Sequence, residues 1–594
     1  MRLQDNSTQR GARRSLALGI LLTLFTVPAL KAQAPSKDNV DAQVTAPAIK
    51  VESRIVLVDV VVTNHRGETI PKLGQDAFQI REDGKPQIIT AFEEHKREIS
   101  APANPPVPPP DVHTNISAAP PGDAVNVLLI DMLNTYPWFQ KDVCNQAIKF
   151  LASVPPGTRL AIFTLNEQQL RLVRGFTADF SGLSGALNGQ QSGVIPEASW
   201  LNPTPSQHGA EMEGLSAMIK MQAAPVAVDS MREYLGQENA AKIGARSELT
   251  LQAFQHLARY LSGIPARKNI IWFADSFPVS FATDDKVHAP NHQLHLQQTS
   301  DMLTAAQVAI YPASARGLLG TTSAWSPNPF KGSDISADNA QQLFEEFATS
   351  QTNMESLARE TGGRAFYNSN ALDTAMAKAV EEGSRYYTIA YSPTNTKNDG
   401  RYRRIEVKIA DADYKLSYRR GYYADNPAVT PTAANGDPLI PLVGFGMPNF
   451  DQIAYKIRAL PLDPQPAPDA PRAGLNTDLK GPLIRYGVDA AVSLRNFKLE
   501  TTPDGVRHGR IEAMLVAYGR DGRILNIVKL NSRMALTSKD YSQLLASGLP
   551  FHLEIDIPPG DIYLRTGVYD LASGSAGTLG FPLTVIRPAT AATK

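Results

Sequence analysis

The sequence predicts a multi-domain protein of mixed α/β and all-β class, in which a doubly wound, mostly parallel sheet is inserted in or flanked by β-sandwich domains. Three observations predict this class. The 594 residues exceed the usual domain size of about 100–200 residues. Between residues 123 and 385, apolar strand-length runs alternate with helix-length stretches, which is typical of a parallel sheet covered by helices. The flanking segments alternate apolar and polar residues between Gly, Asp and Asn turns, which is typical of antiparallel strands.

The composition limits the classes of partner. The chain holds 58 basic and 58 acidic residues, so no net field attracts nucleic acid or anionic lipid, and no nucleic-acid partner is expected. Cys144 is the single cysteine, which excludes an intramolecular disulfide.

The N-terminus has the pattern of a secretory signal peptide over residues 1–34. Arginines precede the apolar run "SLALGILLTLFTVPAL", which is followed by Lys31 and the small-residue stretch "AQA" ending at Ala34. The run is shorter than the roughly 20 residues that span a bilayer, and no later segment approaches that length. We therefore expect export to the periplasm or the extracellular space, with no membrane span in the mature chain.

The first β segment, residues 50–98, contains "SRIVLVDVVVT", "AFQIRED" and "KPQIITAFEEH", which are too few strands for a sandwich of their own. A proline-rich linker follows at 99–122. Three further strand patterns occur at 386–424: "YYTIAYSP", "GRYRRIEVKI" and "YKLSYRRGYYA". The two β segments are predicted to pair as one discontinuous sandwich, interrupted by the α/β domain at 123–385.

Within the α/β domain, the predicted strands are "VNVLLI", "TRLAIFTL", "QLRLVRGF", "NIIWFAD", "VAIYPA" and "RAFYN", and the helices between them include 137–153 and "SELTLQAFQHLARYLSGIP". A Pro-, Gly- and Ser-rich stretch at 190–246 interrupts the rhythm and is predicted to be an insertion over one edge of the sheet. Gly362 and Gly363 suit the end of a helix, and no nucleotide-binding fingerprint is present. Beyond a Pro/Ala-rich linker at 425–480, six strand patterns predict a second sandwich at 481–588.

The stretch "VNVLLIDMLNT" places Asp131 where the first strand of the α/β domain ends. Open α/β sheets bind ligands at this carboxyl edge, and Asp275 ends another strand there. One interpretation is structural, since Asp131, Asn134 and Thr135 all suit a helix cap. The other is a metal site in which Asp131, Thr135, Thr177 and Asp275 supply the oxygen ligands that Mg²⁺ or another divalent cation requires.

The strand end and its partners resemble the metal-ion-dependent adhesion site of von Willebrand factor A (vWA) domains, which combines a D-x-S-x-S motif, a threonine and a second aspartate. The resemblance assigns the metal to Asp131, Thr135, Thr177 and Asp275, with Asn134 orienting the loop. Leu133 stands where the motif has its first serine. The resemblance implies that an acidic residue of a partner completes the metal coordination.

The chain as a whole resembles the VWFA-related family of exported, mainly acidobacterial proteins. The stretches that carry this resemblance include "VLLIDMLNT", "IPARKNIIWFADSFP", "LARETGGRAF" and "YYTIAYSPTNTKNDGRYRRIEVKI". We therefore expect an exported binding protein of adhesion type that engages a protein or surface ligand. One alternative is a metal-free structural protein of the cell envelope, which Leu133 favours. The other is a hydrolase with its site in the 190–246 insertion, although no nucleophile motif is present and no enzyme is expected.

Overall fold

The computed structural model describes residues 55–586 with gaps, of which the longest are 97–108, 117–123, 182–216, 279–289, 315–336 and 425–436. The predicted signal peptide lies outside these residues. Among the helices of the described residues, none combines the length and apolar character needed to cross a membrane.

The first β domain combines strands from both sides of the α/β domain. In the sheet of order β13-β1-β11-β4, strands before residue 96 alternate with strands after residue 385. In the sheet of order β14-β12-β2-β3, two strands after residue 385 lie beside two strands before residue 96. Buried side chains of both sheets, such as Val58 and Ile405, share one core, as in a sandwich. The strands are β1 (Val56–Thr63), β2 (Phe78–Glu82), β3 (Lys85–Gln87), β4 (Ile89–His95), β11 (Tyr386–Tyr391), β12 (Tyr402–Ile409), β13 (Lys415–Ser417) and β14 (Gly421–Tyr423).

The α/β domain is built on a five-stranded sheet with the order β10-β9-β6-β7-β8. The first four strands are parallel, and β8 runs antiparallel to β7. The parallel strands are buried along their length except for the last residue of β10, because helices cover both faces. The strands are β6 (Val125–Asp131), β7 (Leu160–Leu165), β8 (Leu170–Thr177), β9 (Lys268–Ala274) and β10 (Val308–Ser314).

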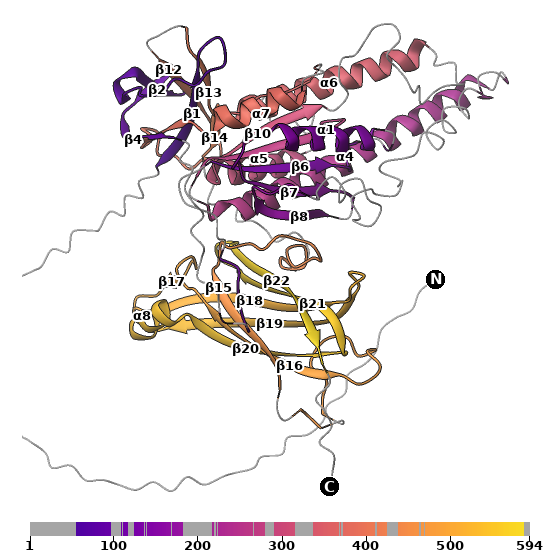
Figure 1. The fold of residues 1–594 in the computed structure, drawn as a ribbon, viewed down its shortest axis with the longest axis vertical. Helices are drawn as coiled ribbons and strands as arrows, with labels where there is room; N and C mark the ends of the chain where they lie inside the picture. Colours follow the sequence, from indigo (N-terminus) through magenta and orange to yellow (C-terminus); the bar gives the residue numbers. More distant parts are fainter. Residues whose placement is uncertain are drawn as a thin grey trace, which may run out of the picture. The chain divides into compact units, whose positions relative to one another are not determined.

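Helices α1 (Gln140–Ser153) and α7 (Leu372–Gly383) pack on one face of this sheet, and α4 (Pro225–Ser262), α5 (Pro290–Ala305) and α6 (Ala337–Thr361) pack on the other (Figure 1). The apolar stripe of α1 is formed by Val143, Ala147 and Leu151, which recur every four residues and are buried. Cys144 lies beside them as a buried free thiol.

Two parts of the α/β domain differ from the sequence prediction. Residues 225–246 of the expected insertion belong to the long helix α4, while most of the remainder lies outside the described residues. The expected strand "RAFYN" makes only a single bridge, between Phe366 and Ala313. Gly362 ends α6 with a φ of +80°, and a Cβ there would lie 2.8 Å from the backbone nitrogen of Arg419, so the helix stop predicted at this glycine is confirmed.

The C-terminal sandwich pairs a sheet of order β20-β16-β15-β5 with a second of order β17-β18-β21-β22, to which β19 adds on β18. Both sheets contribute to one core. A short helix, α8 (Ser538–Ser547), precedes β20. The strands are β5 (Val112–Thr114), β15 (Tyr455–Pro461), β16 (Ile484–Val492), β17 (Glu500–Thr501), β18 (Arg507–Tyr518), β19 (Ile524–Leu536), β20 (Leu549–Ile557), β21 (Gly560–Asp570) and β22 (Ala576–Val585).

Two of these strands correct the predicted linkers. Strand β5 lies within 99–122 and β15 within 425–480, and β15 pairs with both β5 and β16. The sequence of β15 alternates apolar and basic residues, and in the structure Tyr455 and Ile457 are buried while Lys456 and Arg458 are not. The prolines around this alternation favoured the prediction of a linker. Strand β5 has three residues and pairs with β15 at the edge of the sheet.

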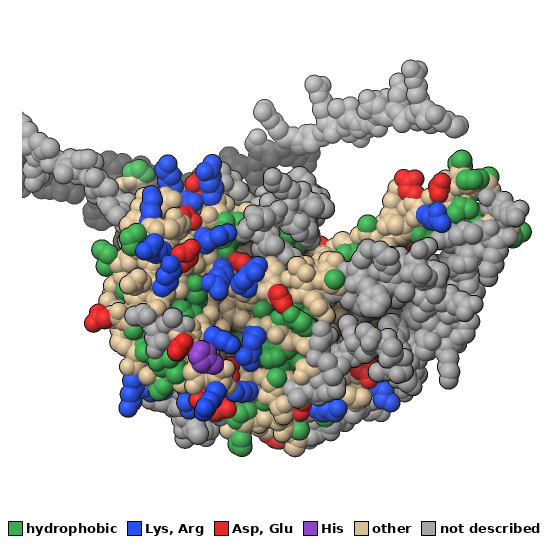
Figure 2. Space-filling view, turned by 90° about the horizontal axis from the view of Figure 1, so that it is seen from above, with side chains coloured by type: hydrophobic (Ala, Val, Ile, Leu, Met, Phe, Trp, Pro, Cys, Tyr) green, Lys and Arg blue, Asp and Glu red, His purple; other side chains and the backbone are tan. Residues whose placement is uncertain are grey.

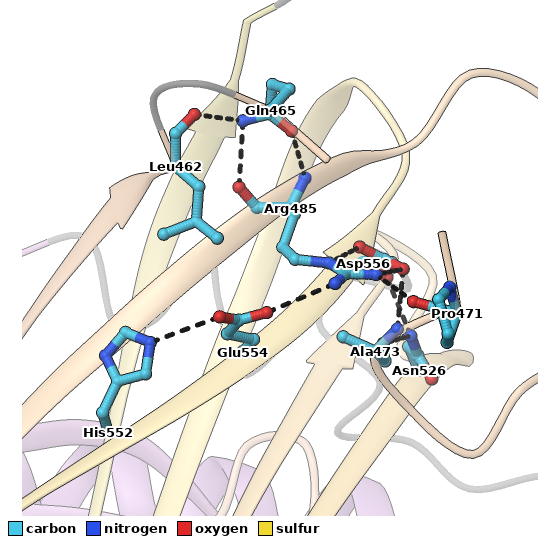
Figure 3. A network of polar contacts seen from close by, with 9 residues as sticks. All are labelled: Leu462, Gln465, Pro471, Ala473, Arg485, Asn526, His552, Glu554 and Asp556. Atoms are coloured by element: carbon cyan, nitrogen blue, oxygen red, sulfur yellow. Dashed lines mark hydrogen bonds and ion pairs between the residues drawn. The ribbon is translucent and has the colours of Figure 1, made fainter. Parts of the chain in front are cut away.

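A polar network fixes Leu462, Gln465, Pro471 and Ala473 of the expected second linker on the sandwich (Figure 3). Arg485 on β16 binds both carboxylate oxygens of Asp556 on β20, at 2.7 and 2.9 Å. Gln465 accepts a hydrogen bond from the Arg485 backbone, and Asp556 accepts one from the backbone of Ala473. The linker residues that make these bonds are therefore part of the folded sandwich.

Candidate functional site

Strands β6 and β9 define the point at which the strand order of the α/β sheet reverses. From β6 the chain continues through α1 on one face, and from β9 it continues through α5 on the other face. In open α/β sheets the crevice outside the carboxyl ends of two such strands is the usual ligand site. Asp131 ends β6, and Asp275 directly follows β9, so both predicted aspartates lie at this point.

Asp131 is fully buried, and its carboxylate accepts three hydrogen bonds. The backbone N–H of Asn134 donates to Oδ1 at 2.8 Å, and Asn134 Nδ2 donates to Oδ2 at 2.7 Å. Trp272 Nε1 on β9 donates to the same Oδ2 at 2.8 Å. Three of the roughly four lone pairs of the carboxylate are therefore used inside the protein.

Thr135 joins the ends of the two strands. Its hydroxyl donates to the backbone oxygen of Asp131 at 2.5 Å and accepts from the backbone N–H of Asp275 at 3.2 Å. The backbone N–H of Ser276 donates to the backbone oxygen of Asn134 at 2.9 Å. The loop after β6 and the loop after β9 are thus bonded directly to each other.

Helix α4 closes the cluster from the side. Asn134 Nδ2 also donates to Thr250 Oγ1, at 2.8 Å, and Thr250 donates to the backbone oxygen of Arg246 at 2.7 Å. Arg246 is buried, and its positive charge acts on Asp131. Among the described residues, no donor reaches the buried Oδ1 of Asn134.

The environment of Asp131 changes its acidity. Burial raises the pKa of this carboxyl from 3.8 to about 6, and the hydrogen bonds from Asn134 and Trp272 together with the charge of Arg246 oppose that rise. A carboxylate held by three N–H donors next to an arginine is stable at neutral pH without a metal ion.

Thr177 does not belong to this cluster, which corrects its predicted placement. It is the last residue of β8 and pairs with Leu160, the first residue of β7, whereas Asp131 pairs with Leu165, the last residue of β7. Because β8 is antiparallel, its C-terminal end lies at the opposite edge of the sheet. The hydroxyl of Thr177 instead accepts a hydrogen bond from the backbone of Asp179.

Leu133 occupies the position of the missing serine and points into the protein. It is 1% exposed and belongs to the core between the sheet and helices α4 to α6. A side chain that packs in this way fills the space of a hydroxyl ligand and contributes apolar burial instead.

The donor set does not fit a divalent ion. The carboxylate of Asp131 is engaged by N–H groups, the side chain of Leu133 offers no oxygen, and Thr177 lies at the other edge. Within the described part of the chain, no group of three or more His, Cys, Asp or Glu side chains is placed to hold a metal. Asp131, Thr135 and Asp275 are all less than 4% exposed, so a partner's side chain does not reach them in this conformation.

Trp272, Thr250 and Arg246 are the members of the cluster that sequence reasoning missed. Trp272 lies inside the predicted strand "NIIWFAD", where an indole N–H needs a partner once it is buried, and this was the available signal. Thr250 and Arg246 lie more than 110 residues after Asp131, and only the folding of α4 over the sheet brings them to it.

Comparison with protein family models finds no match for this sequence. Comparison with curated proteins finds none either. Among solved structures, the chain is similar to a von Willebrand factor type A protein from Catenulispora acidiphila, with 12% identity over 51% of this chain and 66% of that one, and a TM-score of 0.20. No family assignment follows from these comparisons.

Proposed function

We propose that this chain is an exported protein-binding scaffold whose α/β domain works without a divalent ion at its switch point. The observation that carries the proposal is the complete burial of Asp131, whose carboxylate accepts three hydrogen bonds inside the protein. The cluster then serves as a clamp that ties β6, β9 and α4 together and stiffens the carboxyl edge of the sheet. The signal-peptide pattern at 1–34 supports export, and the resemblance of "VLLIDMLNT" to vWA domains supports a protein partner.

A second candidate is the metal-dependent adhesion function that the resemblance implies. One observation favours it: Asn134 Oδ1 is a buried oxygen without a donor among the described residues, on a side chain that is bonded to Asp131. In this candidate Asp131, Thr135 and Asp275 are the ligands that remain, and Thr177 is not one of them.

Calorimetric titration of the mature protein with Mg²⁺ and with Mn²⁺ separates the two candidates, with Asp131→Ala as the reference. A metal-free clamp gives equal heats for both proteins and no saturation. Saturable Mn²⁺ binding that Asp131→Ala abolishes would overturn the proposal and support the second candidate.

The protein partner is tested by capture from an envelope extract with and without a chelator. We expect the same partner to be retained in both conditions, and retention should be unchanged for Thr177→Val. Loss of the partner in the chelator would contradict a metal-free mode of binding.

A further inference from the structure

A hollow of about 460 Å³ lies where the C-terminal end of α6 and the segment after it meet strand β13 and the residues that follow it. Sites for small organic ligands usually have volumes of about 300–1,000 Å³. Among the described residues that line the hollow, Glu355 is the only acidic one. The other side chains that matter here are Arg359, Arg364, Arg420, Tyr367, Tyr418 and Leu416.

Two of the arginines are held against aromatic rings. The guanidinium carbon of Arg420 lies 4.5 Å from the centre of the Tyr418 ring, and Arg420 Nη1 donates a hydrogen bond of 2.6 Å to the Tyr418 hydroxyl. The guanidinium carbon of Arg364 lies 4.9 Å from the centre of the Phe366 ring. Stacking fixes the plane of a guanidinium and leaves the N–H groups in that plane able to bind an oxyanion.

The neighbouring carboxylates leave much of this donor capacity in place. Arg364 lies 3.6 Å from Glu382, and Arg359 lies 3.7 Å from Glu360, which are ion-pair distances longer than a good hydrogen bond. Each guanidinium has five N–H donors. Glu355 accepts a hydrogen bond from the Tyr367 hydroxyl, and this bond reduces the repulsion between the Glu355 carboxylate and an anionic ligand.

Two glycines fix the shape of the hollow. A Cβ on Gly362 would lie 2.8 Å from the backbone nitrogen of Arg419, and a Cβ on Gly363 would lie 1.9 Å from the backbone oxygen of Ile310. The chain after α6 therefore runs directly against both neighbours, with no side chain between them. The backbone of Thr361 also bridges to Arg419, which holds the two walls together.

The surface charge agrees with an anionic ligand. Three arginines and one glutamate line the hollow, and Figure 2 shows Lys and Arg side chains on the left of the face seen there. The whole chain has no net charge, so the positive charge of the lining is local. Local positive potential raises the concentration of anions at such a site.

We propose that this hollow binds an organic anion, whose carboxylate or phosphate group contacts Arg364 and Arg420 and whose apolar part lies on Tyr367 and Leu416. The site is separate from the switch point and does not rest on the function proposed above. It also gives a role to the "LARETGGRAF" stretch, whose glycines otherwise only end a helix.

Ligand-observed NMR on the mature protein tests this proposal with three probes: phthalate, inorganic phosphate and benzyl alcohol. Phthalate carries both acid groups and a ring, inorganic phosphate carries an acid group alone, and benzyl alcohol carries a ring without an acid group. We expect phthalate to bind most tightly. Arg364→Gln combined with Arg420→Gln should weaken its binding at least tenfold, as expected for the loss of about 1.4 kcal/mol. Added NaCl should weaken binding to the unchanged protein.

The matched control removes two exposed arginines of the C-terminal sandwich, Arg520→Gln with Arg533→Gln, which changes the net charge equally and should leave phthalate binding unchanged. Arg364→Lys with Arg420→Lys keeps the charge without the planar fork and should retain part of the affinity. Thermal unfolding of each variant shows whether it is folded. Equal phthalate binding by the unchanged protein and the folded Gln variant, or tighter binding of benzyl alcohol than of phthalate, would overturn the proposal.

Discussion

Trp272 on β9 donates a hydrogen bond of 2.8 Å to the carboxylate of Asp131 on β6, across the point where the strand order of the sheet reverses. The indole also packs edge-on against Phe254 and Phe277, so the bond lies within apolar surroundings. A hydrogen bond to a charged group in such surroundings is stronger than one in water, and its loss is correspondingly costly. The predicted metal ligand is therefore one half of a buried strand-to-strand contact.

The first prediction concerns the pH dependence of stability. Burial in the folded protein raises the pKa of Asp131 from 3.8 to about 6, so this carboxyl binds a proton more tightly in the folded protein than in the unfolded chain. The free energy of unfolding should therefore fall as the pH rises from about 4 to about 6, by up to about 3 kcal/mol, and then level off. Asp131→Asn should lack this component. Calorimetric unfolding of both proteins across this range measures the difference, and parallel profiles would contradict the burial of a titrating Asp131.

The second prediction concerns restoration of the adhesion motif. Leu133→Ser supplies the missing hydroxyl but empties a core position, so it should destabilise the protein by about 2–5 kcal/mol, as large-to-small core substitutions do. It should not create Mn²⁺ binding, because the carboxylate of Asp131 stays engaged. Leu133→Ala is the control for lost volume. Calorimetric Mn²⁺ binding by the Ser variant and not by the Ala variant would show that Leu133 alone blocks the site.

The third prediction separates the two threonines of the predicted metal site. Thr135→Val removes a hydroxyl that is bonded to both strand ends and should cost about 1–3 kcal/mol. Thr177→Val makes the same chemical change at the opposite edge of the sheet and should cost less than about 0.5 kcal/mol. Urea unfolding of the pair provides the comparison. Equal losses would mean that Thr135 does not join the loops as described.

The fourth prediction concerns Arg565, which is fully buried in the C-terminal sandwich. Its guanidinium donates to the backbone oxygens of Leu442, Met447 and Pro448 at 2.7 to 3.1 Å. Arg565→Met leaves these oxygens without their donor, so residues 439–450 should detach while the sandwich remains folded. Limited proteolysis with thermolysin, read by mass spectrometry, should show much faster cleavage in this segment. Arg520→Met, at an exposed ion pair, is the control and should be cut at the original rate.

Local pattern was sufficient for most of the elements that build the site. Strand β6, which was predicted from "VNVLLI", ends at Asp131, and β9, which was predicted from "NIIWFA", ends at Ala274, because a buried parallel strand is predominantly apolar. The same argument gave Asp275 its place beside Asp131, since parallel strands bring their carboxyl ends to one edge.

Local pattern failed where the direction of a strand mattered. The stretch "QLRLVRGF" has the pattern of a strand, but this pattern does not indicate the direction of the strand. In the structure it runs antiparallel to β7, which places Thr177 at the edge of the sheet opposite to the predicted site. The strands β5 and β15 were missed for a related reason: each is short or surrounded by proline, and each is stabilised by a partner distant in the sequence.

The sequence by itself determined which residues can be buried and where strands end, because apolar periodicity and turn residues act over a few positions. It therefore brought Asp131 to an edge where a ligand could bind. Only the tertiary structure decided what surrounds that carboxylate, because Trp272 and Arg246 act on it, and Thr250 binds the neighbouring Asn134, from elements more than 110 residues away along the chain. The protonation and the bonding capacity of a buried group depend on those neighbours, and they favour a closed clamp over an open metal site.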